Sequence, residues 1–174
     1  LEAEDEDDLE RRTAKLAEVV EPLGGLDLYV LEPRAGAELI EARERAFYVA
    51  KAAGADDIID AVVPRTQIPT LLTRAAGFAA QAGALMTGCG HAGDGNVHLS
   101  VFCPDDEARH ELLGQLFAEA VSLGGAVSGE HGLGVEKRAY HDALVDPLRG
   151  VLEDRIKAAF DPEGVLRPIR PGKE

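Results

Sequence analysis

Hydrophobic residues in the first part of the chain recur with the spacing of amphipathic helices. Apolar positions over 9–23 lie on one helical face, and the Gly24-Gly25 pair is typical of a helix end. The apolar run over 26–31 predicts a strand, and the pattern over 37–52 predicts a second helix. The chain is therefore expected to begin with an arm of helix, strand and helix.

Patterns typical of strands and of helices alternate through the middle of the chain. The β-branched run that ends at Pro64 is typical of a strand, because proline cannot donate a hydrogen bond within a sheet. Further along, Val97, Leu99 and Val101 alternate with other side chains and predict another strand. In order, the patterns predict a strand over 58–63, a helix over 69–82, strands over 84–87 and 97–102, a helix over 105–123 and a strand over 126–128.

The order β-α-β-β-α-β is that of a ferredoxin-like unit. Such a unit has an antiparallel sheet with its helices on one face, so the expected fold class is α+β. Two more helices, over 135–144 and 147–160, are predicted after the unit. The expected architecture is thus a ferredoxin-like unit between an N-terminal helix and strand arm and a pair of C-terminal helices.

The acidic composition excludes some classes of partner. Asp and Glu number 32 against 18 Lys and Arg, which leaves a net charge of −14. Phosphate contacts require basic residues, so no nucleic acid is expected as a partner. No stretch is long and apolar enough to predict a transmembrane segment. Two cysteines, Cys89 and Cys103, cannot form a disulfide framework, so a reducing, cytoplasmic setting is the simplest interpretation.

Glycines crowd into two windows that hold or adjoin three of the histidines. Ten of the 19 glycines fall within 83–95 and 124–134. The first window brings His91 and His98 to either side of a tight turn, where a hairpin would place them within about 5 Å of each other. The second window offers the carboxylate of Glu130. Two imidazoles and a carboxylate are a ligand set of zinc and related divalent ions, so a metal site is predicted.

Alternative interpretations of the first window are weaker. Residues 88–93 fit the dinucleotide motif G-x-G-x-x-G, but a turn and a strand follow where that motif requires a helix. Cys89 could be a fourth metal ligand, although a small buried thiol is the simpler expectation. Each histidine taken alone could equally be a hydrogen-bonded structural residue.

Two longer motifs run through these windows. H-x-G-D-G-N-x-H spans 91–98, and S-G-E-H-G-x-G-x-x-K spans 128–137, with weaker matches at 62–65 and 156–164. Together they resemble the signature of the FAD-linked oxidase C-terminal domain. That domain occurs in glycolate oxidase, D-lactate dehydrogenases and D-2-hydroxyglutarate dehydrogenase. The resemblance implies a flavoenzyme that oxidises a small D-2-hydroxy acid to the 2-oxo acid, with hydride transfer to FAD.

The resemblance also implies roles for single residues. His131 would be the catalytic base, and Asn96 and Arg43 would bind the substrate, Arg43 through the carboxylate. The divalent metal, zinc or manganese, would be bound by His91, His98 and Glu130, and the cofactor-binding residues would be Gly93, Gly95 and Lys137.

Departures from the family pattern bear on the substrate. Ile58 and Phe47 stand where the hydroxyglutarate enzymes carry a lysine and a threonine. A smaller, lactate-like or glycolate-like acid is therefore expected. The ending over 166–173 also departs from the usual family sequence, which puts contacts of the tail with the flavin in question.

The resemblance further predicts the domain organisation and the partners. The chain over 1–174 would be the substrate and metal domain, shortened at its N-terminus. It would comprise a remnant of the cap subdomain over 1–54, the ferredoxin-like unit over 55–128, and the second signature loop with the C-terminal helices over 129–174. The FAD-binding domain would be absent and supplied by a partner domain or subunit, so the fragment alone would be redox-inactive. A homodimer is left open, and an electron-acceptor partner could place the protein at a membrane surface.

Two other functions remain open from the sequence. The same histidine and glutamate site could activate water in a non-redox, metal-dependent hydrolase. A ferredoxin-like unit could instead be a ligand-binding module, an idea that rests on fold analogy alone.

Overall fold

The computed structural model describes residues 3–166, apart from the side chains at positions 46 and 47. The expectations about the side chain at position 47 and about the tail after residue 166 lie outside the described residues. Within them the chain forms two units, one ending at Arg45 and one beginning at Ala46. None of the described helices is long and apolar enough to cross a membrane.

The first unit consists mainly of helices. Helix α1 spans Glu6–Val20, and the side chain of Asp5 caps it by accepting a hydrogen bond from the backbone N–H of Asp8. A 3₁₀ turn, η1 (Glu21–Leu23), ends at Gly24, whose φ of 87° is accessible to glycine at low cost. Helix α2 spans Pro33–Glu44 and begins with proline in its first turn.

Two predictions for this part of the chain were wrong. Residues 26–31 form no strand; the segment has no pairing strand among the described residues, and Leu26 is 95% exposed. A strand needs an adjacent strand to form hydrogen bonds with its backbone N–H and C=O groups. An apolar run in the sequence does not ensure that such a partner is present. The single helix predicted over 37–52 is two helices, α2 and α3 (Ala46–Ala52), which break at Arg45.

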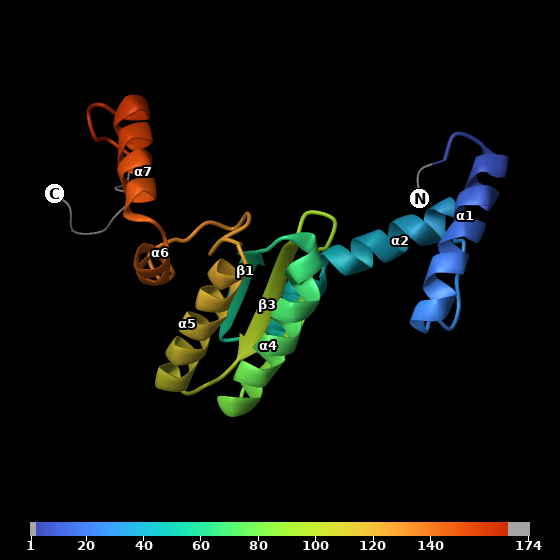
Figure 1. The fold of residues 1–174 in the computed structure, drawn as a ribbon, viewed down its shortest axis with the longest axis horizontal. Helices are drawn as coiled ribbons and strands as arrows, with labels where there is room; N and C mark the ends of the chain where they lie inside the picture. Colours follow the sequence, from blue (N-terminus) through green and yellow to red (C-terminus); the bar gives the residue numbers. More distant parts are fainter. Residues whose placement is uncertain (1–2, 167–174) are drawn as a thin grey trace. The chain divides into compact units, whose positions relative to one another are not determined.

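The second unit is built on a three-stranded antiparallel sheet. Its strands are β1 (Asp57–Val62), β2 (Leu85–His91) and β3 (Asn96–Phe102), in the order β1-β3-β2. Helices α4 (Ile68–Gln81) and α5 (Asp106–Ser122) lie side by side on one face of this sheet (Figure 1). A 3₁₀ turn, η2 (Arg65–Gln67), leads into α4. The predicted α+β class with an antiparallel sheet is confirmed.

The hydrophobic core fills the space between the sheet and these two helices. Successive residues of a strand face opposite sides, so Ile59 on β1 and Val101 on β3 face the helices. They pack with Leu71 of α4 and with Leu112 and Phe117 of α5, and all five side chains are under 2% exposed. Each buried side chain of this size stabilises the fold by about 1.5–3 kcal/mol. The alternate residues of the same two strands therefore face the other side of the sheet.

The last predicted strand is reduced to a single contact. Residues 126–128 make one isolated bridge, between Val62 and Ala126, instead of a strand. Gly125 allows this contact because a Cβ there would lie 2.1 Å from the carbonyl oxygen of Val62. Strand β2, in contrast, runs further than the predicted 84–87, because its glycines continue the pairing with β3 up to His91.

Helices α6 (Arg138–Leu144) and α7 (Pro147–Phe160) follow the second glycine-rich window. Both predicted C-terminal helices are thus present, although α6 begins three residues later than expected. Tyr140 of α6 packs on Phe117 of α5, with ring centroids 5.3 Å apart. Its hydroxyl also contacts Nδ1 of His110, at 2.5 Å. These contacts join α6 to the core of the unit.

Candidate metal centre

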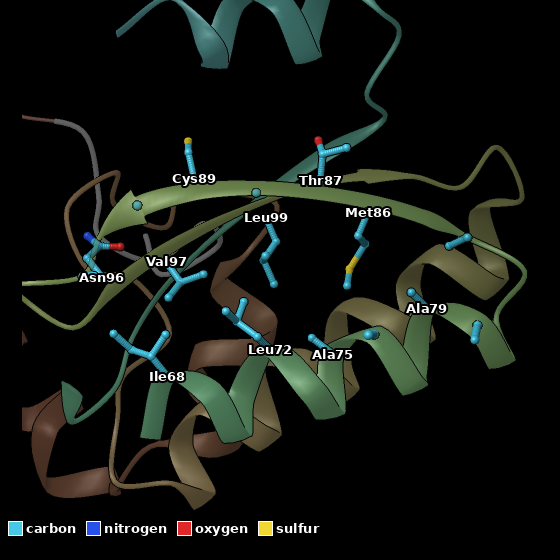
Figure 2. Close-up of a pocket in the computed structure, with 16 residues that line it drawn as sticks. Ile68, Leu72, Ala75, Ala79, Met86, Thr87, Cys89, Asn96, Val97 and Leu99 are labelled. Atoms are coloured by element: carbon cyan, nitrogen blue, oxygen red, sulfur yellow. The ribbon is translucent and has the colours of Figure 1, made fainter. Parts of the chain in front are cut away.

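The sheet face opposite α4 and α5 carries the polar residues of the first signature motif. The antiparallel register places Asp60 of β1 and Cys89 of β2 on either side of His98 of β3. In the next row, Asn96 of β3 lies opposite His91 of β2. The side chain of Cys89 points away from α4, whereas those of Val97 and Leu99 point toward it (Figure 2). The histidines therefore lie on the side of the sheet opposite α4 and α5.

A tight turn brings His91 and Asn96 into register. The backbone N–H of Asp94 donates to the carbonyl of His91 at 2.8 Å, and that of Gly95 donates to Ala92 at 3.3 Å. Gly95 has a φ of 80°, and a Cβ there would lie 2.1 Å from the carbonyl oxygen of Val63. Only glycine satisfies both conditions, so this position has a structural reason apart from any ligand.

The second signature motif is held against the sheet by one carboxylate. Oδ2 of Asp60 accepts hydrogen bonds from the hydroxyl of Ser128 at 3.0 Å and from the backbone N–H groups of Glu130 and His131 at 2.8 Å each. Gly129 lies so close to β3 that a Cβ on it would be 2.5 Å from Nδ2 of Asn96. The loop is thus fixed at its backbone, and its side chains are directed to the histidines of the sheet.

Asp60 is a residue of the site that the sequence motifs did not reveal. It is only 2% exposed. Burial raises the pKa of its carboxyl, but the backbone hydrogen bonds from His131 and Glu130 and the hydroxyl of Ser128 outweigh this, so the pKa lies below its usual value. A lone acid inside a β-branched run was the available signal, because an unpaired buried carboxylate is costly.

Three predicted ligand side chains converge on the open face. Nε2 of His98 lies 2.9 Å from Oε1 of Glu130, and Nε2 of His91 lies 3.4 Å from the same oxygen. The three ligand atoms all lie within 4.8 Å of one another. The imidazole of His131 stacks on that of His98, with ring centroids 4.5 Å apart and planes at 11°. The four groups thus form one cluster from the two signature motifs, which are separated in the sequence.

The geometry of this cluster fits a divalent cation. Zinc binds nitrogen and oxygen ligands at about 2.0–2.2 Å, so two ligand atoms of a tetrahedral site stand roughly 3.3 Å apart. The separations of 2.9 and 3.4 Å lie on either side of that value. The side chains of His91 and Glu130 are 48% and 49% exposed, so solvent or a substrate can reach them. A second group, made of Asp60, His98 and His131, also has its atoms within 4.8 Å.

A cavity of about 510 Å³ opens beside the cluster. Asn96 reaches it from β3 and is 6% exposed, and its Oδ1 is buried without a hydrogen-bond partner. A buried amide oxygen without a hydrogen-bond partner is unusual in a folded protein. The cavity is lined by Val62, His91, Asp94, Asn96, Gly129 and Glu130.

A different, apolar cavity of about 520 Å³ lies on the helix side of the sheet. It lies between α4 and strands β2 and β3, where Leu72 and Ala75 face Met86 and Leu99 (Figure 2). Gly88 and Gly90 fall on this face and contribute no side chain. This cavity holds none of the predicted metal ligands.

The remaining predicted residues take other positions. Arg43 belongs to α2 of the first unit, and its role in substrate binding stays a prediction. Lys137 donates from Nζ to the carbonyl of Ile58 and lies 3.5 Å from a carboxylate oxygen of Asp57, so it ties the second loop to β1. Gly93 has open space around it. The cofactor roles predicted for Gly93, Gly95 and Lys137 stay predictions.

The two cysteines differ in their surroundings. Cys103 is 3% exposed, in line with the expected structural role. Cys89 is exposed, so the expectation of a buried thiol was wrong. Its strand lies at the edge of the sheet, and alternation directs its side chain to the face opposite α4 and α5. Cys89 also does not belong to either group of clustered ligand atoms among the described residues.

Comparison with known proteins agrees with the two motifs. Residues 1–170 match the family described as FAD linked oxidases, C-terminal domain. An FAD-linked oxidoreductase of Mycobacterium tuberculosis, itself described as uncharacterized, is 52% identical over 153 residues, which are 88% of this chain and 33% of that protein. A D-lactate dehydrogenase of Archaeoglobus fulgidus is 32% identical over 154 residues, 87% of this chain and 34% of the relative.

A third relative is the glycolate oxidase subunit GlcD of Escherichia coli, which is 36% identical over 115 residues, 63% of this chain and 23% of the relative. The chain thus spans about a third or less of the length of these curated relatives. The match covers nearly the whole chain, including both signature motifs and the cluster that they form. The chain therefore belongs to the family of FAD-linked oxidases and represents their C-terminal domain.

Proposed function

We propose that the chain is the substrate and metal domain of a flavin-dependent enzyme that oxidises a small D-2-hydroxy acid to the 2-oxo acid. Family membership supports an FAD-linked oxidoreductase. Relatives named D-lactate dehydrogenase and glycolate oxidase support the class of substrate. A FAD-binding partner domain or subunit would hold the flavin. A lactate-like or glycolate-like acid is favoured, because the apolar side chain of Ile58 offers no charge to a second carboxylate.

His91, His98 and Glu130 would hold a divalent cation, zinc or manganese, in this proposal. When bound, the cation would lower the pKa of the substrate hydroxyl, and the flavin would accept the hydride. The second-loop backbone, fixed by hydrogen bonds to Asp60, keeps Glu130 directed toward the two imidazoles. The protein thus supplies two neutral ligands and one negative ligand and leaves the remaining positions to the substrate and water.

His131 would act as the general base. Its imidazole stacks on that of His98 and borders the cation site, so it can accept the proton of the substrate hydroxyl. Loss of that proton from oxygen and of a hydride from the adjacent carbon converts the alcohol to a carbonyl. Asn96, which lines the cavity, would orient the substrate, and Arg43 would bind the carboxylate as a bidentate clamp.

One observation carries this proposal: ligand atoms of His91, His98 and Glu130 lie within 4.8 Å of one another, with the imidazole of His131 stacked beside them. Structural histidines of a hairpin would satisfy themselves with nearby backbone groups. Here the three ligand atoms face one another, and two of the residues, His91 and Glu130, line a cavity. That arrangement is typical of a metal site that stays open to substrate.

Metal binding tests the first half of the proposal. The chain is titrated with Zn²⁺ and with Mn²⁺ by isothermal calorimetry, next to the variants His98→Ala and His110→Ala. His110 is an imidazole outside the cluster and serves as the matched control. We expect binding by the wild type and by His110→Ala, and a loss of more than about 100-fold, beyond the cost of an outer-shell change, for His98→Ala. Equal affinities in all three proteins would exclude the site.

Flavin reduction tests the second half. The chain is combined with a FAD-binding partner, and bleaching of the flavin band is followed with D-lactate, glycolate and D-2-hydroxyglutarate. We expect reduction by at least one of the smaller acids and its loss in His131→Ala. A protein that binds the metal but shows no flavin reduction with any of these acids would favour the non-redox alternative.

A further inference from the structure

We propose that two copies of this chain associate through the outer edge of strand β2, with the two β2 strands antiparallel across a two-fold axis. The contact would join the two three-stranded sheets into one, with α4 of each copy beside the junction. The inference goes beyond the proposed function and does not depend on the metal or on the flavin.

The outer edge of β2 is the first argument. Strand β2 pairs with β3 alone, and no other strand of the described chain lies on its outer side. An edge strand presents unpaired backbone N–H and C=O groups, and proteins commonly protect such an edge with charged residues, proline or a bulge. Residues 85–91 contain no proline and no Asp, Glu, Lys or Arg, and their pairing with β3 continues without a bulge. The edge is thus open to a further strand.

The distribution of charge is the second argument. The chain has a net charge of −14, so two copies repel each other as they approach. Residues 66–93, which include α4 and β2, contain no acidic residue, although 32 of the 174 residues of the chain are acidic. Arg74 is the one Lys or Arg of this segment, and its guanidinium lies 2.6 Å from the carboxylate of Glu119. A second copy can therefore meet this segment without facing acids of like charge.

An apolar groove borders the same edge. The cavity of about 520 Å³ between α4 and the sheet is lined by uncharged residues, and Leu72 lines it from α4 with 42% of its surface exposed (Figure 2). A Cβ on Gly88 would lie 2.8 Å from the side chain of Leu99, and a Cβ on Gly90 would lie 2.4 Å from the carbonyl oxygen of Asn96. Close packing on β3 thus excludes larger residues at both glycines. The groove is left without side chains there, and a side chain of a partner can fill it.

The residues of β2 suit pairing with a second β2. Full pairing of residues 85–91 centres the two-fold axis on Gly88 and places Met86 opposite Gly90 of the second copy. Met86 is the one large side chain among the three residues of β2 on the helix side, so each copy directs it to a position where the other copy has none. Methionine adapts well to irregular gaps. The helix side of the strand is therefore complementary to its own copy.

A segment of the FAD-binding partner is the competing occupant of this edge. A second copy is favoured because the pattern of one methionine and two glycines complements itself under a two-fold axis, and because the segment lacks the acids that would keep two copies apart. The two occupants differ in the oligomeric state of the chain alone, which can be measured directly.

The test is sedimentation equilibrium of the chain at about 100 µM, because small interfaces associate weakly. We expect the mass of two chains. Leu72→Glu brings like charges together in the contact and should weaken association at least about tenfold. Leu152→Glu is the matched control, because Leu152 is a helical leucine of similar exposure, 48%, that lies on α7 outside the segment 66–93. It should leave the dimer unchanged.

A cysteine substitution tests the register. An axis on Gly88 places Thr87 opposite Cys89 of the second copy, with Cβ atoms about 4.5–5.5 Å apart, close to disulfide distance. Within one chain, positions 87 and 89 are about 6.8 Å apart along the strand, too far for a disulfide. We expect Thr87→Cys to give a covalent dimer with oxidised glutathione. The wild type and the double variant Thr87→Cys/Cys89→Ser should give none.

A wild type that stays monomeric at this concentration would overturn the inference, whether or not any variant folds. A dimer that is insensitive to Leu72→Glu, or that lacks the expected disulfide in Thr87→Cys, would place the contact elsewhere and also overturn it. A monomer whose association with a FAD-binding partner is weakened by Leu72→Glu would assign the edge to that partner instead. Failure of metal binding would refute the proposed metal site and leave this inference standing.

Discussion

Replacement of Gly129 by alanine should damage the cluster without removing any of its side chains. Gly129 lies between Ser128 and Glu130 in the second loop, and its added Cβ would lie 2.5 Å from Nδ2 of Asn96 and 2.9 Å from Oδ1 of Asp60. An ordinary contact is about 3.4 Å, so something must move by about 0.9 Å. Asn96 and Asp60 are 6% and 2% exposed, and neither can turn into solvent. The loop itself therefore has to move away from the sheet.

Both stability and metal binding should respond to this movement. Overpacking of a filled site costs about 1–3 kcal/mol, which lowers the melting temperature of a chain of this length by about 2–12 °C. Ligand positions in metal sites tolerate errors of about 0.2 Å. A shift of about 0.9 Å in the backbone that carries Glu130 exceeds that tolerance, so we expect Zn²⁺ affinity to fall by at least about tenfold.

The assay compares thermal melting, followed by circular dichroism, and calorimetric metal titration in the wild type and Gly129→Ala. Gly77→Ala is the control, because Gly77 is an exposed position within α4 where an added Cβ meets no atom within 4 Å. That substitution should stabilise the helix by about 0.5–1 kcal/mol and leave metal binding unchanged. If Gly129→Ala melts and binds metal as the wild type does, the close packing of loop and sheet is refuted.

Three further predictions concern other parts of the second unit. Phe117→Ala should destabilise the fold by about 3–5 kcal/mol in urea unfolding, since Phe117 is fully buried and its removal leaves a cavity; a loss under about 1 kcal/mol would contradict this core. A thiol reagent should label the exposed Cys89 rapidly and the buried Cys103 only after unfolding, as peptide mapping would show. Burial and the negative charge of Asp57 raise the pKa of Tyr140, so the neutral phenol stabilises the fold below the unfolded pKa of about 10, and this contribution is lost as the pH rises through the folded pKa. Between about pH 9 and pH 11 the wild type should therefore lose more stability than Tyr140→Phe, and parallel losses would refute the shift.

Much of the fold could be predicted from local patterns. The apolar stripe of α4 and the capping aspartate of α5 indicate helices from neighbouring residues alone, because a helix makes most of its backbone hydrogen bonds within itself. The β-branched run before Pro64 and the alternation of Val97, Leu99 and Val101 likewise predicted β1 and β3. Predictions of strands were wrong where a strand depends on pairing with a distant segment. Residues 26–31 are apolar but form no strand, and 126–128 make a single bridge.

The residues of the candidate site were likewise only partly predictable from the sequence. Residue types and spacing within each motif identified His91, His98 and Glu130 as ligand candidates, because metal sites draw on a small set of side chains. The motifs themselves said nothing of Asp60. Its partners stand 38, 68, 70 and 71 positions further along the chain, at His98, Ser128, Glu130 and His131.

The sequence by itself determined the helices, the tight turn after His91, and the chemical character of the ligands, since all of these depend on neighbouring residues. Only the tertiary structure decided that Asp60 stands beside His98 and holds the second loop. That contact follows from the pairing register of β1 and β3. The register places every second residue of each strand in the core and the residues between them on the face opposite α4 and α5. A shift of one residue would exchange the two faces and bury the site among the helices.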